Sequence, residues 1–229
     1  MTMTSTAAPT AGGHHPEDVN VVGRRWRVGV LLIILADASF VAAMLFTYFY
    51  LRGLNTRGNW IPAKTSTSPI WVGWVIALGL VLSAVAYRWA EIGIRKGDRR
   101  RLQTGTAIAL LLLVIDLVIQ GIQFFTFPFR TYTGAYASSV ITLAGANIFH
   151  LLLTLFIGVG LWNRARLGKY DATNHWQVRL GRIWWAWIAV AAVATALTTS
   201  FVTGPKPVVP GPLNEGPSAS AGLHAVDAW

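Results

Sequence analysis

The sequence predicts an all-α polytopic integral membrane protein built around a bundle of five transmembrane helices. Of its 229 residues, 54% are apolar and only 12% are charged, whereas soluble proteins carry about 25% charged residues. The apolar residues are gathered into five long runs separated by Gly, Pro and basic residues. The eleven tryptophans fit the same class, because Trp concentrates at membrane–water interfaces.

Each apolar run is long enough to cross a bilayer, which needs about 20 helical residues. The fourth run is the longest, and we expect it to tilt or to extend beyond the bilayer. Helix-breaking Gly and Pro residues follow the first, third and fifth runs, where loops are required. The predicted spans are about 28–50, 70–92, 105–127, 136–162 and 183–203.

The predicted membrane domain, residues 23–203, is flanked by two segments without apolar periodicity. Residues 1–22 are rich in Thr, Ala, Gly and His, which predicts a disordered N-terminal tail. We expect no signal peptide here, because the apolar run that follows is too long and has no small-residue cleavage site after it. Residues 204–229 are rich in Pro and Gly, which predicts an irregular C-terminal tail.

The basic residues predict how the protein is oriented. Fourteen of the nineteen Lys and Arg residues lie in the N-terminal flank or around the second and fourth loops. The positive-inside rule therefore places the N-terminus in the cytoplasm and the C-terminus outside. The net charge of +10 does not indicate nucleic-acid binding, because these residues lie between apolar runs rather than on one polar face.

The sequence provides no set of ligands for a redox centre. It has no cysteine, which excludes iron–sulfur clusters and thiolate copper sites. His150 is the one histidine within a predicted span, whereas a copper–haem centre needs several. We therefore expect no metal, haem or other cofactor on this chain. The other histidines are His14, His15, His175 and His224.

Ionisable residues in hydrocarbon are the first candidates for function, because they are unfavourable there unless they face protein or water. Asp37 has two interpretations: a protonated interhelical hydrogen-bond partner, or an acid that handles protons or contacts lipid. Asn147 and His150 share a helix face. Together with Asp37, they are assigned to proton or lipid contact. For His150 alone, a structural hydrogen bond is the simpler interpretation.

The remaining polar residues in the spans suggest contacts between helices. Asp116 and Gln120 lie on one face, and Gln123 adds polarity nearby. We expect a polar seam against a neighbouring helix rather than a proton wire, because a wire needs several groups in series. Arg88 and Glu91 are three residues apart and can pair. Four tryptophans are expected to be interface anchors: Trp60, Trp184, Trp185 and Trp187.

Several short motifs follow one another along the chain. Residues 36–43 read Ala-Asp-Ala-Ser-Phe-Val-Ala-Ala, and residues 48–52 read Tyr-Phe-Tyr-Leu-Arg. Gly-Asn-Trp-Ile-Pro follows at 58–62, Gln-Gly-Ile-Gln-Phe at 120–124 and Gly-Ala-Asn-Ile-Phe-His at 145–150. In this order they resemble the motifs of cytochrome c oxidase subunit III, from the haem–copper oxidases, in a short and divergent bacterial form with five spans.

The resemblance aligns Asp37 with the family's membrane-buried glutamate and His150 with the second histidine of a two-histidine motif. Four positions depart from the family pattern. Gln123 stands where a glutamate is usual, Asn147 replaces the first histidine, and Ala186 and Ala189 replace polar residues of the last span. These departures weaken any role that the family's polar groups have at those positions.

The resemblance implies an accessory subunit of a respiratory terminal oxidase in a bacterial plasma membrane. Such a subunit would pack against oxidase subunits I and II, bind phospholipid and support proton uptake, while haem and copper stay on its partners. Asp37→Ala would then shorten the working life of the oxidase and leave its haem spectrum unchanged.

Three alternatives remain. A related branch of the family accompanies nitric oxide reductases. A small transporter or channel acting alone would require a continuous polar path and internal repeats, which the sequence does not indicate. A membrane scaffold for another complex is the third.

Overall fold

The computed structural model describes residues 19–55, 60–61 and 66–203. They form five long α-helices, and a short 3-10 helix, Thr131–Thr133, precedes the fourth. All five are long and apolar enough to cross a membrane, which confirms the predicted five-helix membrane fold. Their bounds are α1 Val19–Leu54, α2 Ile70–Arg95, α3 Arg99–Phe125, α4 Ala135–Arg166 and α5 Trp176–Ser200.

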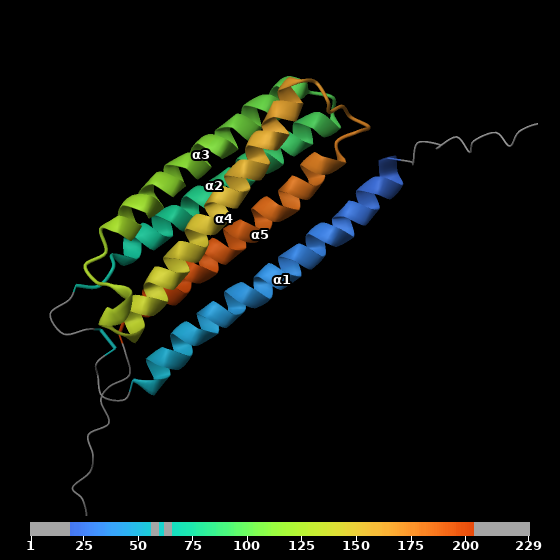
Figure 1. Cartoon of the computed structure of the whole chain (residues 1–229). Helices are drawn as coiled ribbons and strands as arrows, with labels where there is room; N and C mark the ends of the chain where they lie inside the picture. The colour runs from blue at the N-terminus through green and yellow to red at the C-terminus, as the bar shows by residue number, and fades with distance from the viewer. Residues whose placement is uncertain (1–18, 56–59, 62–65, 204–229) are drawn as a thin grey trace, which may run out of the picture.

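Helices α2 to α5 form a four-helix bundle, and α1 lies along its side next to α5 (Figure 1). Helix α2 packs against α3 and α5, and α3 also packs against α4, whereas α1 touches only α4 and α5 among the described helices. In the most apolar segment of α1 only 6% of the residues are buried, against 28–44% in the other four helices. Most of α1 therefore faces outward.

All five helices extend past the predicted spans at one end of the molecule, where α1, α3 and α5 begin. We call this the basic end, and the other the opposite end. Arg is a good helix former whose long side chain reaches water from a buried backbone, so the helices continue through their basic flanks. Residues 19–22, expected in the tail, are helical. Residues 1–18 and 204–229, with His14, His15 and His224, lie outside the described residues.

A three-residue turn joins α2 to α3. Gly97 has a φ of +80°, a left-handed conformation that favours glycine. Its N–H donates to the carbonyl of Ile94 (2.9 Å), and the N–H of Asp98 donates to that of Gly93 (3.0 Å), which is a Schellman ending. The Asp98 carboxylate then caps α3 by accepting from the N–H of Arg101 (2.9 Å).

The centre of the bundle is held by aromatic stacking and close approach. Trp185 of α5 is fully buried and stacks on Tyr87 of α2, with ring centroids 4.2 Å apart. Its indole N–H donates to the hydroxyl of Ser83 (3.1 Å), which donates to the carbonyl of Ala109 on α3 (2.9 Å). An aromatic pair contributes about 0.5–1.5 kcal/mol beyond area burial. One side chain thus ties three helices together.

A smaller aromatic cluster closes the opposite end between α1 and α4. Trp60 is only 1% exposed, and its ring lies edge-on to Tyr48 (5.3 Å) and Tyr136 (5.7 Å). The hydroxyl of Tyr48 donates to the carbonyl of Phe201, just after α5 (3.0 Å). The expectation that Trp60 is an interface anchor is therefore wrong, because neighbouring aromatic rings cover it.

Candidate functional site

Asp37 joins α1 to two helices of the bundle at mid-height. Its Oδ1 lies 2.9 Å from Nε2 of His150 on α4. Its Oδ2 accepts a hydrogen bond of 2.6 Å from the indole N–H of Trp187 on α5. The side chains of Asp37 and His150 are 17% and 6% exposed. We call these three residues the Asp37 junction.

The His150 side of the junction continues into the bundle. The carbonyl of His150 accepts from the hydroxyl of Thr154 (2.7 Å), and that hydroxyl accepts from the indole N–H of Trp184 (2.9 Å). The Trp184 ring also lies edge-on to the imidazole, 6.5 Å between centroids. The indole of Trp184 is thus held beside the imidazole by its hydrogen bond to Thr154.

An acid and an imidazole at hydrogen-bond distance can share one proton. The pair is neutral overall whether the proton sits on the Asp37 carboxyl or on the His150 ring, so it fits a low-dielectric position better than a lone carboxylate does. Moving the proton from one group to the other changes where the charge lies without changing the total.

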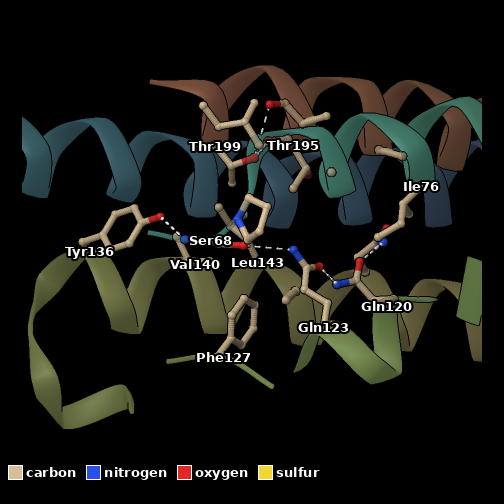
Figure 2. Close-up of a pocket in the computed structure, with 17 residues that line it drawn as sticks. Ser68, Ile76, Gln120, Gln123, Phe127, Tyr136, Val140, Leu143, Thr195 and Thr199 are labelled. Carbon is tan, nitrogen blue, oxygen red and sulfur yellow. Dashed lines mark hydrogen bonds between the residues drawn. The ribbon is translucent and has the colours of Figure 1, made fainter. Parts of the chain in front are cut away.

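A second group of polar side chains forms a hydrogen-bonded chain between α4 and α3 near the opposite end (Figure 2). The amide of Asn147 donates to the Gln120 carbonyl oxygen (2.7 Å), and Gln120 donates to that of Gln123 (2.6 Å). Gln123 donates to the hydroxyl of Ser68, before α2 (3.0 Å). We call these four residues the amide chain. The amide chain thus joins α3 to α4 and to the segment before α2.

Asp116 lies one turn deeper on α3 than Gln120. It is only 2% exposed, and a Cβ on Gly79 of α2 would overlap its carboxyl group. The missing side chain at Gly79 is what makes room for the acid. Oδ2 of Asp116 has no hydrogen-bond partner among the described residues. The carboxyl group of Asp116 on α3 thus lies directly against the backbone of α2 at Gly79.

Glu91 is paired, but not with the expected residue. Its carboxylate accepts from the guanidinium of Arg95, one turn further along α2, and lies 3.1 Å from Nε of Arg182 on α5. Glu91 is 2% exposed, whereas Arg88 is exposed. The predicted Arg88–Glu91 pair is therefore wrong: the two residues share a helix, but Arg88 points outward. Of the two pairs formed instead, the one with Arg182 joins α2 to α5.

The predicted interface tryptophans of α5 also lie elsewhere. Trp184 is 6% exposed and Trp185 fully buried, so both are core residues rather than anchors, because three helices pack around them. Trp187 is half-buried and bonded to Asp37. Among the described residues, the exposed indoles belong to other helix ends: Trp26 and Trp89 at the basic end, Trp71 and Trp74 at the opposite end.

Two adjoining depressions lie where α1 meets α5 near the basic end. The first, of about 250 Å³, is a basic pocket. The second, of about 290 Å³, is an apolar groove between α1, α4 and α5. Leu180 lines both. The basic pocket includes Arg24, Arg27, Trp176, Arg179 and Arg182. The apolar groove includes Val30, Ile33, Leu153, Ile157 and Trp184.

The loop between α4 and α5 carries His175 and an Asp-centred turn outside the membrane spans. Oδ1 of Asp171 accepts from the N–H of Thr173 (2.7 Å), from its hydroxyl (2.6 Å) and from the N–H of Asn174 (2.7 Å). These hydrogen bonds lower the pKa of the exposed Asp171 carboxyl below 3.8. Within the described part of the chain, no three His, Asp or Glu side chains gather as a possible metal site.

The five apolar helices and the polar contacts between them define a multi-pass membrane protein of the all-α class. A family model described as Cytochrome c oxidase subunit III matches residues 5–199. The chain belongs to this family, as the sequence motifs predicted. Its general role is therefore that of a cytochrome c oxidase subunit III, which works in a complex with other oxidase subunits.

Curated relatives of this chain carry the same family name, although their sequence identity to it is low. Cytochrome c oxidase subunit 3 of Prototheca wickerhamii is 27% identical over 186 residues, which cover 79% of this chain and 70% of that protein. The Thermostichus vulcanus protein of the same name is 22% identical, over 81% of this chain and 88% of its own length. The Sus scrofa protein of the same name is 23% identical, over 79% of this chain and 70% of its own length.

Sequence reasoning named Asp37 and His150 but did not bring them together. They are 113 residues apart in the chain, and no spacing rule relates residues on different helices. Trp187 was named for another reason, and Ser68 and Arg182 were not candidates. Asp37 and His150 do lie at similar depth in their spans, which is the one sequence signal that could have paired them.

Proposed function

We propose that this chain is the accessory subunit III of a respiratory haem–copper terminal oxidase, with no redox centre of its own, and that it stabilises subunit I, binds phospholipid and supports proton uptake. Haem and copper would be held by its partners, subunits I and II. The observation that carries the proposal is the Asp37 junction: a half-buried acid lies 2.9 Å from a buried imidazole and joins an outlying helix to the bundle, in a chain of this family.

Phospholipid binding is supported by the two depressions beside α1. The arginines of the basic pocket suit an anionic headgroup, and the beginning of α5 adds its positive helix end. The apolar groove is lined almost wholly by carbon and suits an acyl chain. Because Leu180 lines both depressions, one lipid molecule can place its headgroup in the first and a chain in the second.

Support for proton uptake is assigned to Asp37 and His150, whose side chains are close enough to share a proton. Asn147 belongs to the amide chain, which does not include Asp37. We therefore place proton handling on Asp37 and His150, and we assign Asn147 to helix packing.

Contact with subunit I is assigned to the outward surface of α1. This surface is apolar and largely uncovered, with Phe46 69% exposed and Leu35 64% exposed. It suits another membrane-spanning chain. We further propose that the basic end faces the cytoplasm of a bacterium, because Lys and Arg accumulate on that side of plasma-membrane proteins.

The first test is purification of the chain in mild detergent from its native membrane. We expect haem absorbance and a large histidine-rich membrane subunit to co-purify with it, together with oxygen consumption. A complex that reduces nitric oxide and not oxygen would move the chain to the nitric oxide reductase branch. A chain that runs alone and transports solute in liposomes would refute the proposal.

The second test is Asp37→Ala in the assembled complex. We expect an unchanged haem spectrum and normal initial turnover, followed by faster loss of activity during sustained turnover. Ser39→Ala is the matched control: Ser39 is exposed on the same helix, and its hydroxyl bonds only the Leu35 carbonyl of its own helix (3.0 Å). Loss of haem from the Asp37→Ala complex would contradict the assignment, because Asp37 would then shape the redox core.

A further inference from the structure

A small polar cavity lies inside the bundle near the opposite end, between α2, α3, α4 and α5 (Figure 2). Its volume is about 50 Å³. The amide chain forms one wall, and the hydroxyl-bearing residues Thr195 and Thr199 of α5 face it across the cavity. Apolar side chains such as Ile76 and Leu143 complete the lining. The cavity is thus polar on two sides, although it lies among transmembrane helices.

Among the residues that the structure describes, the amides that line the cavity have more N–H donors than the hydrogen bonds of the amide chain use. A primary amide carries two N–H donors, and Asn147, Gln120 and Gln123 each use one of them within the amide chain. Gln120 is only 4% exposed. A second N–H left unpaired inside a membrane bundle is unfavourable, so each amide needs a further acceptor.

The size of the cavity limits what that acceptor can be. One water molecule occupies about 30 Å³ in the liquid, and a cavity can hold one from about 10–15 Å³ upward. A volume of about 50 Å³ therefore accommodates a small cluster of water and excludes a lipid chain. The Thr199 hydroxyl already donates to the carbonyl of Thr195 (2.9 Å), so its lone pairs can accept from water.

We propose that this cavity is a water-binding site, in which a small cluster of water molecules is held by the amide chain and by Thr195 and Thr199. The proposal concerns α2 to α5 and goes beyond the accessory role proposed above. The cluster also brings water close to Asp116: Gln120 and Ile76 line the cavity, and Asp116 and Gly79 lie about one turn deeper on the same helices. One helical turn rises about 5.4 Å.

The test is radiolytic labelling of the purified native complex, in which X-rays generate hydroxyl radicals from water that oxidise adjacent side chains. Leu143 lines the cavity and is 3% exposed; Leu113 lies in the apolar core and is 1% exposed. We expect Leu143 to be labelled several-fold faster than Leu113. After rapid mixing into water enriched in oxygen-18, the label at Leu143 should contain that isotope. Equal, low rates at the two leucines would overturn the proposal.

A filled cavity provides the matched variant. Thr195→Leu replaces a lining hydroxyl by a larger apolar side chain, and we expect labelling of Leu143 to fall to the Leu113 rate. Thr142→Leu makes the same change at an exposed position of α4 and should leave labelling unchanged. Persistent fast labelling in a folded Thr195→Leu protein would refute the site. If that variant does not fold, the comparison of Leu143 with Leu113 in the wild-type complex decides alone.

Discussion

Helix α1 and the bundle α2 to α5 are held in different ways. The bundle is in contact along its length, through the Tyr87–Trp185 stack and close approaches such as that of Gly79 and Asp116. Helix α1 is attached at a few heights: a Trp26–Trp176 ring contact (6.2 Å), the Asp37 junction, and the Tyr48 contacts at the opposite end.

The difference follows from the solvent. Lipid chains are as apolar as Leu, so burying apolar side chains gives a membrane helix little reason to associate. Close packing and interhelical hydrogen bonds remain. The bundle combines both along its length, whereas α1 has few packing contacts, and the Asp37 junction is its polar attachment at mid-height. Changes in packing should therefore affect the bundle most, and changes in polarity should affect the attachment of α1.

The largest expected effect is overpacking of the bundle. In Gly79→Val, the new side chain would overlap the Asp116 carboxyl, and we expect a loss of about 1–3 kcal/mol or more in the free energy of unfolding. Tryptophan fluorescence during denaturation in detergent measures it. The control is Gly29→Val on α1, where an added Cβ meets nothing within 4 Å. Equal losses in both variants would remove the distinction between the regions.

The attachment of α1 is tested by a double-mutant cycle with Asp37→Asn and His150→Ala. Interhelical hydrogen bonds in membranes average about 0.6 kcal/mol and reach about 1.7 kcal/mol, and we expect a coupling near the upper value because the pair is nearly enclosed. The cycle of Ser39→Ala with His150→Ala should show no coupling. A coupling of zero for Asp37 would mean that α1 is held by its ends alone.

The hydrogen bond of Trp185 is tested by Trp185→Phe. The ring can still stack on Tyr87, but the bond to Ser83 is lost, and we expect a loss of at least about 1 kcal/mol in the free energy of unfolding. Trp71→Phe makes the same change at a position that is 66% exposed and should leave that free energy nearly unchanged. A neutral Trp185→Phe would show that stacking alone holds this part of the bundle.

The smallest effect concerns the Asp171 turn, which belongs to neither region. Its carboxyl has a pKa lowered from 3.8 by the hydrogen bonds of Thr173 and Asn174. The stabilisation it gives is therefore present above pH 3.8 and is lost as the pH falls through the folded-state pKa. The amide chemical shifts of Thr173 and Asn174 should titrate together with a midpoint below 3.8. A midpoint at or above 3.8 would contradict these bonds.

The sequence was sufficient to predict the five spans, because twenty or more consecutive apolar residues leave no other stable choice in a bilayer. It could not predict which faces are buried. Leu111 is 61% exposed and Leu113 only 1% exposed, yet the two are the same residue type on one helix. When lipid and protein interior are both apolar, the pattern of residues carries little information about rotation of a helix.

The candidate site was predicted only in part, because the rotation of each helix could not be inferred from the sequence. Asp37, His150 and Gln120 could be named because polar groups in a span need a partner, and contacts within α3 follow from helical spacing. Their partners on other helices could not be named without the rotation of each helix. Glu91 illustrates the point: Arg88 and Arg95 are both within reach along α2, and only the packing against α5 selects the side that includes Arg182.

The short turn at Gly97 has a mechanical consequence. Three residues link α2 to α3, and both helix ends are capped by backbone and Asp98 hydrogen bonds. Sliding one helix past the other by a turn would require about 5.4 Å, for which this connection has no slack. We therefore expect the α2–α3 hairpin to move as a single rigid strut.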